Sequence, residues 1–192
     1  MSSPPVLPVH ADRFPDLRLR FVATLTLAYW ALLAWQYLHD GVPAHSFAAR
    51  DDMPAISNWW GALTIPLVSW ALTGLIQGSL SAFGTDRSAA DASLRVSAVG
   101  FAAALLYGAA MATLFSFDRE SSVLTALFFA LPVIGAVVPI FRPEFVLGFV
   151  LGMTYTFGPV LPLVVAFGVA LASGLVHVLL RPLLLRLARV AR

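Results

Sequence analysis

The sequence predicts an all-α membrane protein, a polytopic bundle of six transmembrane helices with both termini on the cytoplasmic side. Hydrophobic residues make up 59% of the 192 residues, and only 11% are charged. Apolar runs that approach the length needed to cross roughly 30 Å of hydrocarbon recur along the chain. We find no alternating segments of roughly ten residues, which a transmembrane β-barrel would require, so a helical bundle is the remaining membrane fold.

Six apolar runs lie between charged and turn-forming residues, and each is predicted to form one span. In chain order they cover residues 19–38, 58–80, 96–117, 123–140, 145–157 and 160–180. The fifth run is short, and only the stretch TFGPVLP separates it from the sixth. These two are expected to form either a tight helical hairpin or a partly re-entrant pair, because Pro159 and Pro162 would interrupt a single long helix.

The spans divide the chain into three parts. Residues 1–18 form a cytoplasmic N-terminal segment, which is proline-rich and does not resemble a cleaved signal peptide. Residues 19–180 form the six-helix domain, with an outer loop at 39–57. Residues 181–192, RPLLLRLARVAR, place arginine and leucine at helical spacing. This basic amphipathic tail is expected to lie along anionic lipids of the inner leaflet, and nucleic acid is not an expected partner.

The arginines predict the orientation. All twelve basic residues are arginine, a bias that suggests a bacterial genome rich in GC. With the N-terminus in the cytoplasm, ten arginines lie inside and only Arg50 and Arg119 lie outside, as the positive-inside tendency requires. Both ends of the chain are arginine-rich, so the number of spans should be even. We therefore expect a multi-pass protein of a bacterial inner membrane whose opening loop faces the periplasm.

Small residues recur at four-residue spacing within several spans. Such residues let helices approach closely, because packing must drive association where lipid supplies no hydrophobic force. The sets are Gly74 and Gly78; Gly100, Ala104 and Gly108; and Gly148 and Gly152. They predict helix contacts within one chain, and a homo-oligomer or a membrane-protein partner is also expected.

Two groups of polar residues lie within the spans. Ser69, Thr73 and Gln77 share one face of the second span, where they could line a path for a neutral solute or join helices by hydrogen bonds. Ser173 and His177 share a face of the sixth span. This pair suggests either a proton-handling or serine-activating histidine, or a neutral imidazole that is simply packed against a neighbour. Together with Ser69, Thr73 and Gln77, the pair is also a candidate lining of the solute path.

The outer loop gathers the remaining candidate ligands. His39, Asp40 and His45, together with Asp51 or Asp52, supply the imidazole and carboxylate groups that suit zinc or another divalent metal. Histidine could instead make the loop a proton-sensitive lid, and the two adjacent aspartates could attract cations to a pore mouth. A purely structural interpretation also fits, because DGVP is typical of a turn and the nearby tryptophans are typical of an interfacial belt.

Three functions from different classes follow. The first is a channel or facilitator for a small solute, because the spans are almost free of charge. The second is a membrane-embedded, metal-dependent hydrolase with its His/Asp site on the periplasmic side. The third is an accessory subunit of a larger membrane complex. The chain contains no cysteine, which excludes thiolate chemistry, and it lacks the phosphate-binding and dinucleotide-binding motifs that nucleotide-driven chemistry requires.

Overall fold

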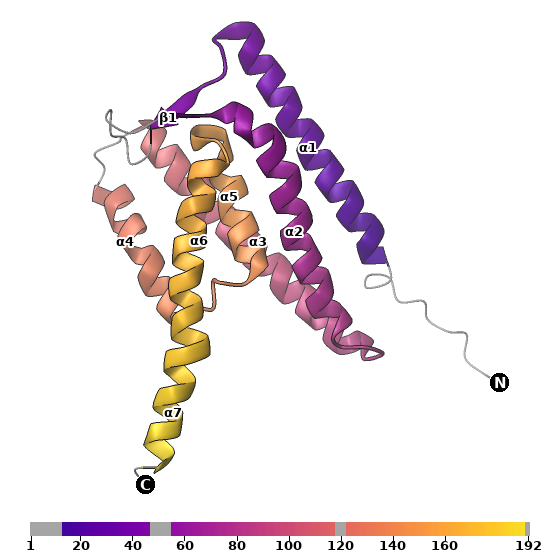
Figure 1. Cartoon of the computed structure of the whole chain (residues 1–192), viewed down its shortest axis with the longest axis vertical. Helices are drawn as coiled ribbons and strands as arrows, with labels where there is room; N and C mark the ends of the chain where they lie inside the picture. Colours follow the sequence, from indigo (N-terminus) through magenta and orange to yellow (C-terminus); the bar gives the residue numbers. More distant parts are fainter. Residues whose placement is uncertain (1–12, 47–54, 118–121, 191–192) are drawn as a thin grey trace, which may run out of the picture.

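The computed structural model describes residues 13–46, 55–117 and 122–190, and these form a mostly helical bundle (Figure 1). The elements are α1 (Phe14–His39), β1 (Ala44–Ser46), β2 (Ala55–Ser57), η3 (Asn58–Trp60), α2 (Gly61–Ser81), α3 (Arg87–Phe117), α4 (Ser122–Val137), α5 (Pro143–Phe157), α6 (Val160–Gly174), η4 (Leu175–Leu180) and α7 (Arg181–Val190). The all-α class is therefore confirmed, and every predicted span coincides with a helical segment.

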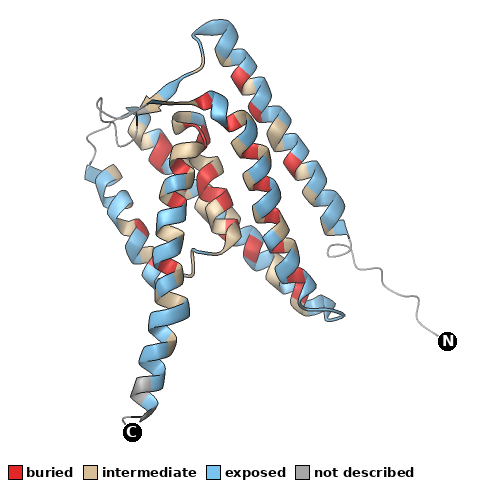
Figure 2. Ribbon diagram, in the orientation of Figure 1, coloured by how far each residue is buried: buried red, intermediate tan, exposed pale blue. Residues whose placement is uncertain are grey.

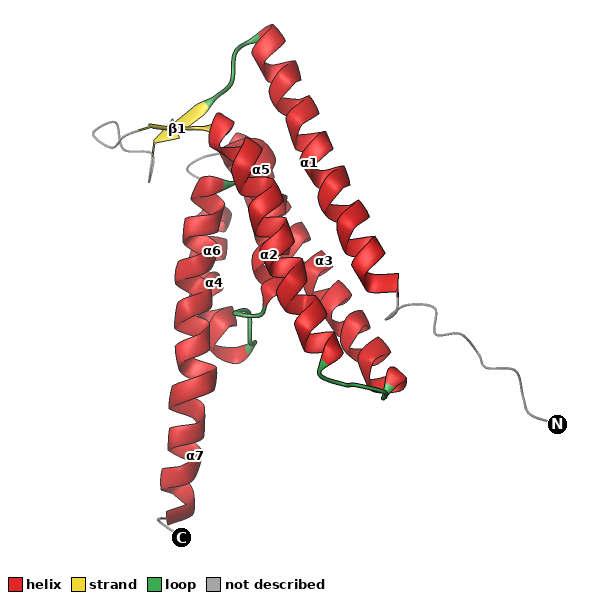
Figure 3. Cartoon of the chain, turned by 45° about the vertical axis from the view of Figure 1, so that its right-hand side comes forward, coloured by secondary structure: helices red, strands yellow, loops and turns green. Residues whose placement is uncertain are grey.

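Four helical stretches are long and apolar enough to cross a membrane: Phe14–His39, Asn58–Ser81, Arg87–Phe117 and Val160–Arg186. The other two helices are shorter, because α4 has 16 residues and α5 has 15. At 1.5 Å per residue they reach only about 24 and 22 Å, less than the roughly 30 Å of the hydrocarbon core. Successive helices from α1 to α6 nevertheless run in alternating directions (Figures 1 and 3).

Several boundaries differ from those predicted, and capping explains two of them. The first helix begins at Phe14, with Pro15 in its first turn, where proline needs no helical N–H partner. The third begins at Arg87, nine residues before its apolar run. Asp86 precedes it and accepts a hydrogen bond from the Ala89 N–H at 3.1 Å. This bond, with that from the Ser88 hydroxyl, holds the pKa of Asp86 below its ordinary value.

The fourth helix ends at Val137, three residues before the predicted end of its span. Pro139 accounts for this difference. Its ring disfavours a helical conformation at the preceding residue, Val138, and it has no N–H to bond the Gly135 carbonyl four residues earlier. The chain therefore turns after α4, and a carbonyl of the last turn is left for another donor.

The outer loop contains a short antiparallel β-ribbon that the sequence did not indicate. Ala44 lies opposite Ser57, His45 opposite Ile56, and Ser46 opposite Ala55. The Ser57 side chain then accepts the Trp59 N–H and begins η3. This ribbon follows the end of α1, leads into η3 and α2, and lies at the upper end of the bundle in Figure 3.

The short helix α5 lies at the centre of the bundle, with α2, α3 and α6 packed around it (Figure 1). Six of its residues are buried, against three of the 26 in α1. Figure 2 shows the same contrast, because the outer helices carry narrow buried stripes and broad exposed surfaces. A helix enclosed by its neighbours needs no lipid-facing surface, which explains why this span is the shortest.

The sixth helix continues through a π-helical turn, η4, into α7. Pro182 explains the change of pitch, because it cannot donate to the Val178 carbonyl four residues before it. The tail is helical, as predicted, but α7 extends the direction of α6 away from the bundle (Figure 1). Its alignment along the lipid surface and its anionic-lipid partners stay predictions.

Candidate functional site

The predicted metal ligands of the outer loop lie in different settings. The exposed His39 ends α1, where its Nδ1 lies 2.9 Å from the Trp35 carbonyl oxygen and its ring lies 4.9 Å from the ring of Trp35. Asp40 is the exposed C-cap of the same helix. The Trp35 contacts give His39 a helix-terminating role, which needs no metal.

His45 lies on β1 and faces the bundle. Its ring centroid is 6.3 Å from that of Phe157, and its buried Nε2 atom has no hydrogen-bond partner among the described residues. Burial lowers the pKa of His45, because the charged imidazolium loses its hydration there. The neutral ring is therefore the favoured form.

The described residues contain no group of three His, Asp or Glu side chains that could hold a metal ion. Asp51 and Asp52 lie outside the described residues. The described part of the loop therefore contains only three of the five predicted ligands. Metal binding by His39, Asp40, His45, Asp51 and Asp52 stays a prediction.

The polar stripe on α2 is occupied by an arginine from α1. The Arg18 guanidinium donates from Nε to the Thr73 hydroxyl at 3.3 Å and from Nη1 to the Gln77 side-chain oxygen at 3.0 Å. Its Nη2 donates to the Trp70 carbonyl at 2.8 Å. Ser69, one turn further along, is 1% exposed and its hydroxyl has no described hydrogen-bond partner. These contacts join α1 to α2, as the structural alternative expects. A solute path lined by Ser69, Thr73, Gln77, Ser173 and His177 stays a prediction.

Ser173 and His177 close the end of α4. The buried Ser173 hydroxyl donates to the Gly135 carbonyl at 2.7 Å, which is the carbonyl that Pro139 leaves without a helical donor. The two ring nitrogens of His177 lie 3.0 Å from the Ser173 carbonyl and 3.4 Å from the Val137 carbonyl. The serine hydroxyl faces backbone carbonyls and not the imidazole, so this pair does not have the geometry of an activated nucleophile.

Ser173→Ala is expected to lower the free energy of unfolding by about 1–2 kcal/mol, because the Gly135 carbonyl would be buried without a donor. Denaturation by SDS in mixed micelles measures this difference. Ser116→Ala is the matched control, since within the described chain its hydroxyl bonds the Ala112 carbonyl of its own helix and no other element. Equal stability of wild type and Ser173→Ala would contradict the capping role.

One buried ion pair was missed in the sequence. Glu144 lies in the first turn of α5, is 2% exposed, and has its Oε1 atom 2.8 Å from the Arg142 Nε. Arg142 Nη2 also donates to the Ser97 hydroxyl of α3 at 3.4 Å. The available signal was the only glutamate next to an apolar run, in FRPEF. A buried carboxylate at a helix N-terminus with an arginine partner holds α5 against α3.

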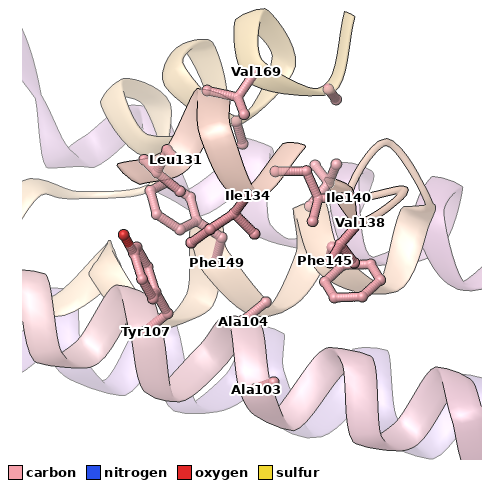
Figure 4. Close-up of a pocket in the computed structure, with 13 residues that line it drawn as sticks. Ala103, Ala104, Tyr107, Leu131, Ile134, Val138, Ile140, Phe145, Phe149 and Val169 are labelled. Atoms are coloured by element: carbon pink, nitrogen blue, oxygen red, sulfur yellow. The ribbon is translucent and has the colours of Figure 1, made fainter. Parts of the chain in front are cut away.

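An apolar cavity of about 290 Å³ lies between α3, α4, α5 and α6 (Figure 4). The only polar side chain in its lining is Tyr107, whose hydroxyl donates to the Leu127 carbonyl at 2.6 Å. The remaining lining is aliphatic or aromatic, including Leu131, Ile134 and Phe149. Such a space favours apolar groups and offers no partner for an ion or a strongly polar solute.

A second, larger space of about 660 Å³ is an apolar groove between α2 and α6. Its walls include Leu72 and Leu75 of α2 and Phe167 and Leu171 of α6, and all of its lining residues are apolar. The groove and the cavity share Val146 and Ala170 as lining residues. These two residues therefore form a wall that the groove and the cavity share.

Comparisons with protein-family models, with curated proteins and with solved structures found no match to this chain. The functional argument consequently depends on the geometry described above. The chain has four helical stretches that are compatible with an integral membrane protein.

Proposed function

We propose that this chain is a multi-pass protein of a bacterial inner membrane, crossing six times with both ends in the cytoplasm. The distribution of charge supports this topology. The nine described arginines lie in four segments at one end of the bundle (Figure 1). They are Arg13, Arg18 and Arg20 at the start of α1, Arg87 and Arg95 in α3, Arg142 before α5, and Arg181, Arg186 and Arg189 in α7. Such an end faces the cytoplasm in most membrane proteins.

Single cysteines test this topology cleanly, because the chain contains none of its own. Asp40→Cys, at the end opposite the arginines, is expected to react with a membrane-impermeant maleimide in intact spheroplasts. Thr85→Cys, in the exposed turn between α2 and α3, is expected to react only after the membrane is permeabilised. The reverse pattern would invert the topology, and labelling of both from outside would contradict a crossing by α2.

Within this topology, the function best supported is binding of a lipophilic molecule that is dissolved in the bilayer. The observation that carries this proposal is the apolar cavity and the wall it shares with the groove between α2 and α6. A molecule with an apolar chain or ring would gain the burial of that surface in both spaces. A lateral route from lipid to the cavity would pass this shared wall and would require the side chains of Val146 or Ala170 to move.

A channel or facilitator for a small solute is less well supported than lipophilic binding. A polar solute needs a row of hydrogen-bonding groups, and the row predicted on α2 holds Arg18 instead. The cavity itself offers only the Tyr107 hydroxyl, which already donates to a backbone carbonyl. The hydrolase and the accessory subunit stay predictions, since nothing in the described residues favours either over lipophilic binding.

A photoreactive lipid tests the proposed binding. Phosphatidylcholine with a diazirine in its acyl chain is expected to label Leu131 or Phe149, which line the cavity and are 8% and 6% exposed. Ala170→Leu should remove most of this labelling, because the larger side chain enters the shared wall. Labelling at the exposed Phe167 should persist and report that the lipid still reaches the groove.

Ala172→Leu provides the matched control, because Ala172 lies on the same helix but lines neither space. It should leave labelling of the cavity unchanged. If wild-type protein were labelled only at lipid-exposed positions, the cavity would not admit the lipid and the proposal would fail.

A further inference from the structure

Four residues along one face of α2 hold the Arg18 guanidinium in a defined position. Thr73, Gln77 and the Trp70 carbonyl accept its three hydrogen bonds, and its Cζ atom lies 3.9 Å from the centre of the Trp70 ring. Gly74 makes room for it, because a Cβ atom there would approach the Arg18 Nη2 to 2.8 Å. The guanidinium is thus fixed by stacking, hydrogen bonds and the absence of one side chain.

No described residue balances the positive charge at this position. All three hydrogen-bond acceptors are neutral, and within the described chain no carboxylate lies within ion-pair distance of Arg18. Arg142 contrasts with it, because Glu144 pairs with that arginine. Arginine stays charged at all physiological pH values, so an anion that reaches this position would meet a positive charge with no ion-pair partner among the described residues.

The guanidinium also retains donors for that anion. It has five N–H groups, and the three hydrogen bonds to α2 leave two of them unused, one on each Nη atom. Terminal guanidinium N–H groups bind the oxygen atoms of a phosphate in a charge-assisted manner. The stacking on Trp70 and the bonds to α2 restrict the arginine before a ligand arrives, which lowers the entropy lost on binding.

The location identifies the source of the anion. Arg18 lies in the second turn of α1, at the arginine-rich end of the bundle. In the topology proposed above, on which this inference rests, that end is the cytoplasmic boundary of the membrane. Trp70 is 49% exposed, so the position opens onto the surface that faces lipid. Anionic phospholipids are concentrated at that boundary in the inner leaflet, and their headgroups lie at this depth. Zwitterionic lipids carry an internal positive group and match an unbalanced arginine less well.

We propose that Arg18, held by Trp70, Thr73, Gly74 and Gln77, binds the phosphate of an anionic phospholipid at the cytoplasmic boundary between α1 and α2. The site is separate from the cavity and groove, because these four residues line neither space. It is also separate from the arginines of α7. The lipid would join α1, the outlying helix in Figure 1, to the rest of the bundle.

Native mass spectrometry of the full chain in a neutral detergent, titrated with phosphatidylglycerol or with phosphatidylcholine of the same acyl chains, tests the proposal. Wild type is expected to bind the first phosphatidylglycerol more tightly than phosphatidylcholine. Arg18→Gln should weaken phosphatidylglycerol binding about fivefold or more and bring the two lipids close together. Arg18→Lys keeps the charge but lacks the planar set of guanidinium donors, so it should retain part of the preference for phosphatidylglycerol.

Arg20→Gln is the matched control, because Arg20 is exposed, carries the same charge and lies two residues away on the same helix. A loss of affinity confined to Arg18→Gln supports the site, whereas equal losses in both variants would mean general electrostatic attraction and would overturn it. Gly74→Ala is a second test variant in case Arg18→Gln fails to fold, because the added methyl group displaces the guanidinium but keeps its charge. An unchanged lipid preference in Gly74→Ala would also overturn the proposal.

Soluble glycerol 3-phosphate distinguishes the two sources of phosphate. An excess of it should leave the first phosphatidylglycerol bound, because the lipid is anchored by its acyl chains as well. Displacement by equimolar glycerol 3-phosphate would assign the site to a free phosphate ester and would overturn the lipid proposal.

Discussion

Gly152→Ala is expected to destabilise the protein by about 1–3 kcal/mol, although alanine is intrinsically the better helix former. The added Cβ would collide with the Leu105 carbonyl oxygen and lie 2.8 Å from the Ala109 nitrogen, both of which are backbone atoms of α3. Backbone atoms of a regular helix cannot rotate away as a side chain can. The two helices would have to separate, and the contact that places α5 at the centre of the bundle would loosen.

The same contact recurs along the pair of helices. A Cβ at Gly108 of α3 would lie 2.6 Å from the Phe149 carbonyl oxygen, and one at Gly148 would collide with the Phe101 carbonyl oxygen. Each glycine therefore brings the two backbones close at successive turns. Gly148→Ala is expected to have an effect similar to that of Gly152→Ala, and unfolding in mixed micelles of detergent and SDS measures both.

Gly168→Ala is the control for this prediction. Gly168 lies in α6, and a Cβ there would meet nothing within 4 Å. Its replacement should leave the protein unchanged or stabilise it by up to about 1 kcal/mol through helix propensity alone. Equal effects at Gly152 and Gly168 would show that the close approach of α3 and α5 contributes little to stability.

The four-residue spacing of small residues predicted that some helices pack closely, but not which ones. Gly100, Gly108, Gly148 and Gly152 all contribute to the contact between α3 and α5. Gly74 has the same spacing and serves another purpose, because it makes room for the Arg18 side chain. The spacing of small residues within one helix shows only that one of its faces can be approached closely. Which helix packs on that face is determined by contacts between distant parts of the chain.

The candidate sites illustrate a second limit of the sequence. Ser173 and His177 share a helix face, which suggested chemistry, yet both contact backbone carbonyls at the end of α4. The Ser173 hydroxyl bonds the Gly135 carbonyl, which Pro139 leaves without a helical donor. The proline was visible in the sequence, but its distance from the serine in space was not. Arg18 was assigned to the cytoplasmic segment because hydropathy begins to rise only after it. Its bonds to α2 depend on a helix that starts earlier than the apolar run.

Arg142→Met is expected to lower the free energy of unfolding by about 3 kcal/mol, because the buried Glu144 carboxylate would lose its partly exposed cationic partner. Methionine preserves most of the aliphatic volume, so the variant removes charge more than packing. Glu144 would keep only the favourable field of the α5 N-terminus, which offsets a fraction of the loss. Arg95→Met, at an exposed arginine of α3, should change stability by no more than about 0.5 kcal/mol.

The second-site variant Arg142→Met/Glu144→Gln separates the two causes that could produce this loss. Neutral glutamine does not carry the desolvation cost of a buried carboxylate, so the double variant should recover most of the stability that Arg142→Met loses. The measured coupling between the two positions would then report the ion pair itself. If the double variant were as unstable as the single one, the loss would be due to the Arg142 contact with Ser97. Arg142 would then hold α5 to α3 by that hydrogen bond more than by its charge.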